Sequence, residues 1–155
     1  MDIKLQWQNP ISLRDGADVS LIYNCDLRQI AERPGIYVFA REHGKSVSPL
    51  YIGRANNLRT RIKQQLDFTR LMKGVSSSLT GRRILLTAVL EPKRGQRIPN
   101  LLKIVESAYI ENALSEGHEL LNMQGTKIPS HTITSGGTKK SHKPFPRNMK
   151  HKIKK

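Results

Sequence analysis

Two short apolar segments on either side of a polar connection constrain the fold of this chain most narrowly. The first is Gly-Ile-Tyr-Val-Phe-Ala at residues 35–40, and the second is Pro-Leu-Tyr-Ile-Gly-Arg-Ala at residues 49–55. The connection between them is polar apart from one valine, and it contains Gly44. β-Branched and aromatic residues bounded by glycine and proline are typical of strands joined by a turn. The pattern predicts a β-hairpin from Pro34 to Arg54.

The rest of the central region alternates between helical and extended patterns. Residues 57–72 form a predicted helix, in which Leu58, Ile62 and Leu66 recur at helical spacing. The apolar run at residues 84–90 predicts a third strand, which is apolar enough to be central in a sheet. Residues 101–114 predict a second helix. The expected fold class is therefore α/β (α+β), with a small three-stranded, mostly antiparallel sheet flanked by helices.

Three segments are expected from these patterns. Residues 1–33 are predicted to be an N-terminal extension, with a strand at residues 3–7 and a short helix capped by Asp26. Residues 34–125 form the predicted central domain. Residues 126–155 are a basic tail with a Ser-Gly-Gly link and two prolines near the end. A composition of this kind buries little apolar surface, so the tail is predicted to be disordered.

The charge of the chain is strongly positive and unevenly distributed. Lys and Arg number 27 against 12 Asp and Glu, which gives a formal net charge of +15. Nine of the Lys and Arg residues and none of the acids lie in residues 123–155. Such a field attracts polyanions, so we expect nucleic acid as a partner.

Several other classes are disfavoured by composition. No apolar run approaches the ~20 residues of a membrane span, and the first residues lack a signal-peptide core. The single cysteine, Cys25, excludes an internal disulfide and a cysteine-rich zinc site. We therefore expect a cytoplasmic, nucleoid-associated protein that does not contact a membrane.

Five positions, taken in order, resemble a known family. The segments Gly35–Tyr37 and Tyr51–Gly53 resemble the two-part signature of the GIY-YIG nucleases, and Arg61, Glu106 and Asn122 follow in the family's order. The resemblance spans roughly residues 34 to 122. It implies a metal-dependent endonuclease of the GIY-YIG fold.

Glu106 is notable even without the resemblance. It lies in the second predicted helix between Leu102 and Ile110, which are four residues away on either side. A carboxylate beside an apolar stripe is costly unless it is paired or binds a metal. One interpretation is a buried salt bridge with Arg61. The resemblance implies the other, in which Glu106 anchors one Mg²⁺ (or Mn²⁺) while water and phosphate oxygens complete the coordination.

The resemblance also implies roles for the remaining positions. A tyrosine serves as the general base, and we place Tyr37 ahead of Tyr51. Arg61 contacts the scissile phosphate, for which a planar guanidinium is well suited. Asn122 orders the active site, although a loop residue that caps backbone groups is nearly as good an interpretation. The chain departs from several relatives in having Gln65 where they have a histidine.

Further residues are expected to contact the nucleic acid. Gly53 interrupts a strand, which often marks the close approach of a ligand such as a phosphate backbone. Arg59 and Lys63 lie four residues apart on the first helix, where a solvated surface is the simpler explanation. The basic residues expected at the interface are Arg54, Arg59, Lys63, Lys139, Lys140, Lys143, Arg147 and Lys150.

The sequence thus predicts an endonuclease that hydrolyses phosphodiester bonds in DNA, and RNA is equally compatible with the pattern. The alternative is a non-catalytic nucleic-acid-binding protein with a vestigial site. A third possibility is a small ribosome-associated RNA-binding protein in which the motif match is coincidental. A single active site nicks one strand, so double-strand cleavage requires a homodimer or two successive cuts.

Overall fold

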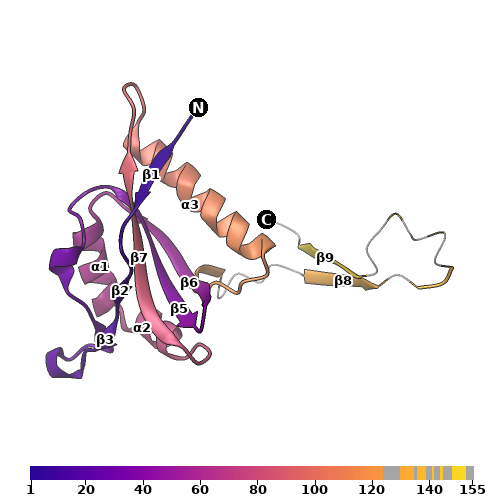
Figure 1. Ribbon diagram of the computed structural model, residues 1–155, viewed down its shortest axis with the longest axis horizontal. Coiled ribbons are helices and arrows are strands. Elements are labelled where there is room, and N and C mark those ends of the chain that lie inside the picture. Colours follow the sequence, from indigo (N-terminus) through magenta and orange to yellow (C-terminus); the bar gives the residue numbers. More distant parts are fainter. Residues whose placement is uncertain (124–129, 135, 139–140, 142–143, 145–147, 153–155) are drawn as a thin grey trace. The chain divides into compact units, whose positions relative to one another are not determined.

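The computed structural model describes residues 1–123, 130–134, 136–138, 141, 144 and 148–152. The chain divides into two compact units, Met1–Asn122 and Met123–Lys155. The first unit is a mixed α+β structure built on an antiparallel sheet (Figure 1). The predicted boundary at residue 33 does not separate compact units, because the first unit begins at Met1.

The predicted hairpin forms the centre of the sheet. Strand β5 (Gly35–His43) pairs with β6 (Ser46–Ala55) on one side and with β7 (Arg82–Glu91) on the other, both antiparallel. The register opposes Tyr37 to Gly53 and Phe39 to Tyr51. A register shift after Phe39 places Ala40 opposite Pro49. Strand β6 therefore lies at the outer edge of the sheet, with β5 as its neighbour.

The sheet has more than the three strands that were predicted, because the N-terminal residues extend it. Strands β1 (Lys4–Trp7) and β2 (Ile11–Ser12) both pair with β7, which gives five strands in the order β1-β7-β5-β6 with β2 beside β7. The short strands β3 (Arg14–Asp15) and β4 (Tyr23–Asn24) form a separate pair. Two 3-10 helices, η1 (Ala17–Val19) and η2 (Leu27–Gln29), complete this region, and the Asp26 side chain caps η2 as predicted.

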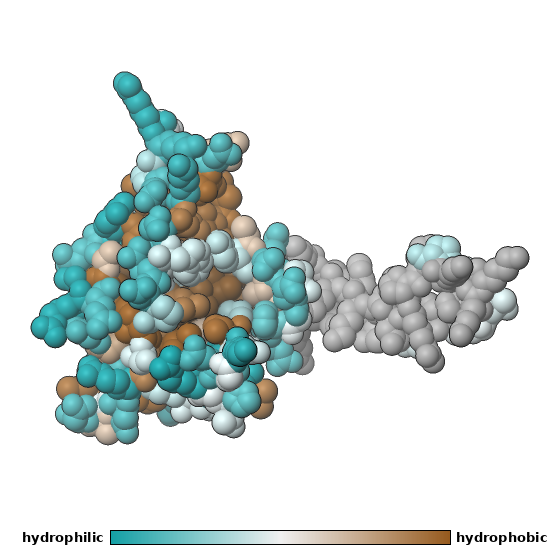
Figure 2. All heavy atoms as spheres, viewed as in Figure 1, coloured by the Kyte–Doolittle hydropathy of each residue, from teal (hydrophilic) through white to brown (hydrophobic). Residues whose placement is uncertain are grey.

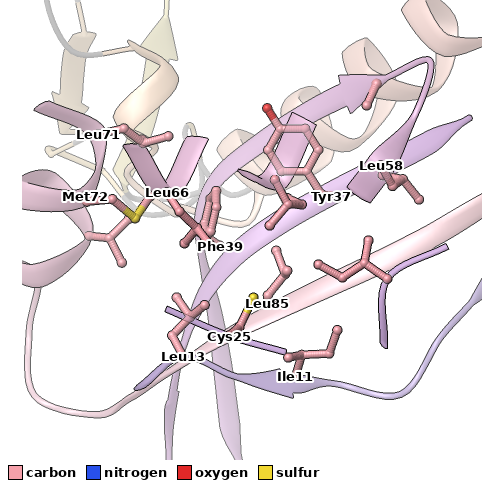
Figure 3. Packing of buried hydrophobic residues seen from close by; sticks show 14 of the residues in the cluster. Ile11, Leu13, Cys25, Tyr37, Phe39, Leu58, Leu66, Leu71, Met72 and Leu85 are labelled. Carbon is pink, nitrogen blue, oxygen red and sulfur yellow. The ribbon is translucent and has the colours of Figure 1, made fainter. Parts of the chain in front are cut away.

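The two faces of the sheet carry different helices. Helices α1 (Leu58–Asp67) and α2 (Thr69–Ser76) pack over one face, where Tyr37, Phe39 and Leu85 belong to the larger core (Figure 3). Helix α3 (Ile98–Ser115) covers the other face, where its Val105 packs with Ile36 and Ala88. In the space-filling view, hydrophobic residues show in the middle of the first unit and hydrophilic residues surround them (Figure 2).

The helix predicted for residues 57–72 is divided in two. Asn57 caps α1 by accepting a hydrogen bond from the Thr60 N–H at 3.1 Å. Phe68 then adopts an extended conformation, with φ −83° and ψ 90°, and α2 begins at the next residue. The first helix therefore ends at Asp67, and an aromatic residue lies at the corner between α1 and α2.

A buried arginine closes the end of α2. Arg83 on β7 donates hydrogen bonds to the carbonyl oxygens of Val75, Ser78 and Gly81 at 2.6–2.8 Å. The cation thus meets the carbonyl end of a helix, where positive charge is favourable.

The second unit contains a two-stranded antiparallel ladder, although the sequence predicts disorder there. Strand β8 (Ser130–Thr134) pairs with β9 (Asn148–Lys152). The short helix η3 (Leu121–Met123) precedes it. The rest of the predicted tail lies outside the described residues. Among the helices that the structure describes, none is both long and apolar enough to cross a membrane.

Candidate active site at the outer edge of β6

The outer edge of β6 is bound by the Asn122 side chain. The Asn122 side-chain oxygen accepts a hydrogen bond from the Ile52 N–H at 2.9 Å, and its amide nitrogen donates to the Ile52 carbonyl oxygen at 2.6 Å. Both backbone groups of Ile52 therefore point away from β5, and the amide replaces the strand that would otherwise pair there. Asn122 thus fixes the backbone between Tyr51 and Gly53.

Gly53 is required by the tyrosine opposite to it. A Cβ atom added at Gly53 would overlap the ring and the hydroxyl oxygen of Tyr37. The ring also stacks beside Tyr51, with centroids 6.2 Å apart and ring planes 28° apart. The close approach expected at this glycine is therefore made by Tyr37, and packing alone accounts for it.

The Tyr37 hydroxyl lies in a protected environment. The side chain is only 2% exposed, and the Gln65 amide donates a hydrogen bond to its oxygen at 2.6 Å. Burial raises the pKa of Tyr37 above its ordinary value, while the Gln65 bond and the nearby Arg61 oppose this effect. A tyrosine that keeps its proton is a poor base, which argues against our placing Tyr37 ahead of Tyr51. Tyr51 is partly exposed.

Glu106 forms an ion pair, but with a different arginine from the one predicted. Its carboxylate accepts a hydrogen bond from the Arg54 guanidinium at 2.8 Å, and both side chains are partly exposed. The predicted buried salt bridge with Arg61 is therefore wrong. Arg54 is opposite Ile36, so it lies on the α3 face, whereas Tyr51 and Gly53 lie on the α1 face.

Residues far apart in the sequence meet at one short stretch of β6. Tyr37 packs on Gly53, Asn122 binds Ile52 and Glu106 binds Arg54. The tyrosines approach this edge from one face of the sheet, and the ion pair approaches it from the other. We call this set (Tyr37, Tyr51, Arg54, Gln65, Glu106 and Asn122) the β6-edge site.

The basic residues of α1 separate onto two flanks of the helix. Relative to the buried Ile62, Arg61 and Gln65 lie on one flank, whereas Arg59 and Lys63 lie on the other. Arg59 donates to the Ile30 carbonyl oxygen at 2.9 Å and pairs with Glu32 at 3.5 Å. It therefore fastens the N-terminal segment to α1. Arg61 is exposed and close enough to Tyr37 to influence its pKa.

The donor set at the site suits only one kind of metal binding. The part of the chain that the structure describes holds no group of three His, Cys, Asp or Glu side chains that could cage a metal. Glu106 supplies one carboxylate, already paired with Arg54. Mg²⁺ is commonly bound through one or two carboxylates together with substrate phosphates and water. The residues therefore fit an ion that is shared with a phosphate, and Glu106 is the residue that would hold it.

Several predicted contacts belong to the second compact unit, Met123–Lys155. Lys139, Lys140, Lys143 and Arg147 lie outside the described residues. The backbone of Lys150 is placed in β9, opposite Thr132.

Gln65 belongs to the site although no role was predicted for it from the sequence. Its amide reaches the Tyr37 hydroxyl from α1. Its position four residues after Arg61, on the same flank of the helix, is the signal that could have identified it.

Comparisons with protein-family models, curated proteins and solved structures find no match to this chain.

Proposed function

We propose that the protein is a GIY-YIG-like endonuclease that hydrolyses phosphodiester bonds in nucleic acid at the β6-edge site. The observation that carries the proposal is the convergence on residues 51–54. Tyr37, Glu106 and Asn122 were singled out from three separate parts of the sequence, and each contacts this stretch directly. Chance matches to short motifs have no reason to meet at one strand edge.

Each residue has a distinct task in this proposal. Arg61 is exposed and binds the phosphate through its planar fork of N–H groups. Tyr51 is partly exposed and takes the proton from the attacking water. Tyr37 and Gln65 hold the Tyr51 ring in place, and Asn122 fixes the backbone on which Tyr51 stands.

The ion pair supplies the remaining chemistry. Arg54 orients the Glu106 carboxylate at 2.8 Å and keeps one of its oxygens engaged. When bound, a Mg²⁺ or Mn²⁺ ion would neutralise charge on the phosphate and on the leaving oxygen. DNA is the proposed substrate, and RNA presents the same phosphodiester.

A second candidate is a nucleic-acid-binding protein with a vestigial site. It is favoured by the ion pair itself, because Arg54 already neutralises the Glu106 carboxylate, which is the residue proposed to hold the metal. The two functions differ in their need for a metal. Binding driven by the net charge of +15 requires no divalent ion, whereas cleavage does.

The test is nicking of supercoiled plasmid in Mg²⁺ or Mn²⁺ by the wild type, Glu106→Ala and Glu116→Ala. Glu116 is an exposed acid at the end of the same helix and serves as the matched control. We expect metal-dependent nicking that is lost in Glu106→Ala and kept in Glu116→Ala. Salt-sensitive binding by all three proteins without any nicking would instead establish the binding protein.

The same assay separates the two tyrosines. We expect Tyr51→Phe to lower the cleavage rate by about 100-fold or more, since general bases contribute factors of this order. Tyr37→Phe keeps the ring that packs on Gly53 and loses only the hydroxyl, so its rate should fall by about tenfold or less. An unaffected Tyr51→Phe enzyme would remove Tyr51 from the mechanism.

A further inference from the structure

An exposed aromatic residue lies at the corner between α1 and α2. Phe68 is 53% exposed, although most aromatic side chains in this unit are buried or partly buried. Its backbone is fixed on both sides, because its N–H donates to the Gln65 carbonyl oxygen and its own carbonyl accepts from the Met72 N–H. The ring is therefore held in solvent by an ordered turn.

Phe68 directly follows the helix that contributes to the β6-edge site. Arg61 and Gln65 are four residues apart on one flank of α1, and Phe68 is the residue after the end of this helix. Gln65 donates to the Tyr37 hydroxyl through its side chain and accepts from the Phe68 N–H through its backbone carbonyl. The exposed phenyl ring is therefore attached to the end of the helix that borders the site.

The chain segment that carries the ring is cationic. Residues 57–77 contain five Lys or Arg residues and one acid, Asp67. Arg61, Arg70 and Lys73 are exposed, and within the described part of the chain their side chains have no hydrogen-bond or ion-pair partner. Arg70 and Lys73 are three residues apart and share one side of α2. Cations with an aromatic residue among them are typical of surfaces that bind single-stranded nucleic acid.

We propose that this corner, consisting of Arg61, Phe68, Arg70 and Lys73, binds an unpaired nucleotide. One base stacks on the Phe68 ring while the three cations contact the phosphates on either side of it. The inference deepens the proposed function, on which it rests, by naming single-stranded or locally unpaired nucleic acid as the substrate class.

The exposed ring is the reason for choosing an unpaired strand. In a continuous duplex the base faces are stacked on one another, so a side chain at the surface reaches only base edges and phosphates. A phenyl ring has no donor or acceptor with which to read an edge. It can contribute to binding only where a base face is open, which requires an unpaired strand.

The test measures binding in EDTA, so that cleavage does not enter. A short single-stranded oligonucleotide carrying 2-aminopurine and its duplex are titrated with the wild type, Phe68→Ala, Phe68→Leu and Phe68→Trp. We expect Phe68→Ala and Phe68→Leu to weaken single-strand binding by about tenfold and to abolish the fluorescence change of 2-aminopurine. Phe68→Trp should retain both, and duplex binding should change by less than about twofold, because stacking requires an open base face.

Leu79→Ala is the matched control, because Leu79 is 75% exposed and lies outside the corner. Wild-type affinity in Phe68→Leu would overturn the proposal, since leucine keeps the apolar contact but cannot stack. Equal reductions in affinity for single strand and duplex would also overturn it. Binding of the corner to anionic vesicles, with oligonucleotide affinity unchanged in every Phe68 variant, would replace nucleic acid with a membrane surface.

The cations are tested separately. Arg70→Gln with Lys73→Gln should weaken binding to both forms and lower the salt slope for single strands by about 0.7 for each phosphate that is no longer neutralised. Lys45→Gln with Arg94→Gln removes two exposed charges from turns elsewhere and should change affinity less. If the two double variants lose the same amount of affinity, only the net charge of the protein matters, and the assignment of Arg70 and Lys73 would be overturned. Because no metal is present, these results are independent of whether Glu106→Ala abolishes nicking.

Discussion

Strand β6 contributes residues to both faces of the sheet, and the interactions on the two faces differ. On the α1 face, Tyr37 packs on Gly53 and keeps its hydroxyl protonated in a buried position. On the α3 face, Arg54 and Glu106 form an ion pair and remain partly open to solvent. Close packing of side chains dominates the first face at β6, and an ion pair dominates the second. Substitutions at Gly53 should therefore act mainly on stability, and those at Arg54 and Glu106 mainly on binding and chemistry.

The largest expected effect tests the role of shape. Gly53→Ala places a methyl group in the space that the Tyr37 ring occupies, so we expect a decrease of about 3 kcal/mol in the free energy of unfolding, measured with urea. Gly136→Ala is the control, because nothing lies within 4 Å of a Cβ added there and its φ is ordinary. A decrease in Gly53→Ala no larger than in the control would show that the ring can move aside.

Alkaline pH should weaken the α1 face alone, because that face holds buried acids in their neutral form. Burial raises the pKa of the Cys25 thiol from 9.0 to about 11. Its contribution is complete below pH 9 and is lost as the pH rises toward 11, since the unfolded thiol ionises first. The difference between the two pKa values corresponds to less than ~3 kcal/mol.

The measurement is urea unfolding of the wild type and Cys25→Ala at pH 8, 9.5 and 11. We expect the stability of the wild type to fall more steeply with pH. Parallel curves for the two proteins would mean that the Cys25 thiol is as accessible in the folded chain as in the unfolded one.

Removal of the Asn122 side chain, which binds the edge of β6, is expected to have a somewhat smaller effect on stability. Asn122→Ala leaves the N–H and carbonyl of Ile52 without their protein partner, which should cost about 2 kcal/mol. Hydrogen exchange would locate the effect, because the Ile52 amide should lose its protection while the amides of α3 keep theirs. Unchanged protection of the Ile52 amide would contradict the stabilising role of the Asn122 hydrogen bonds.

The smallest expected effect is on the charged face. Arg54→Gln removes a partly exposed ion pair, so the free energy of unfolding should change by less than about 1 kcal/mol, and the change should shrink in high salt. The comparison of the two faces predicts that this variant is more impaired in cleavage than in folding. A destabilisation as large as that of Gly53→Ala would show that the two faces do not differ in their contribution to stability.

The sequence was informative where one local rule decided the structure. The hairpin, the Asp26 cap and the buried stripe of Leu58, Ile62 and Leu66 were all predicted, because period and capping are local properties. The break at Phe68 was not predicted. Nothing in the spacing of apolar residues distinguishes one long helix from two short ones joined at a corner.

Long-range partners were the part that local patterns did not determine. Glu106 was singled out correctly as a carboxylate in need of a partner, but the partner was Arg54 rather than Arg61. Helix α3 lies on the face opposite α1, and only the order of the strands decides which arginine is within its reach. Likewise, the strands in residues 1–33 were hard to predict because they are short. Strands β1 and β2 become part of the sheet only by pairing with β7, which is far away in the sequence.

The hydrogen bonds of Asn122 have a consequence for solubility. An outermost strand offers unpaired backbone groups to any other extended chain, and edge-to-edge association of this kind leads to aggregation. Here the Asn122 amide occupies the groups of Ile52, and Pro49, which has no N–H to donate, lies further along the same strand. The residue that shapes the candidate site also shields this edge against pairing with a second molecule.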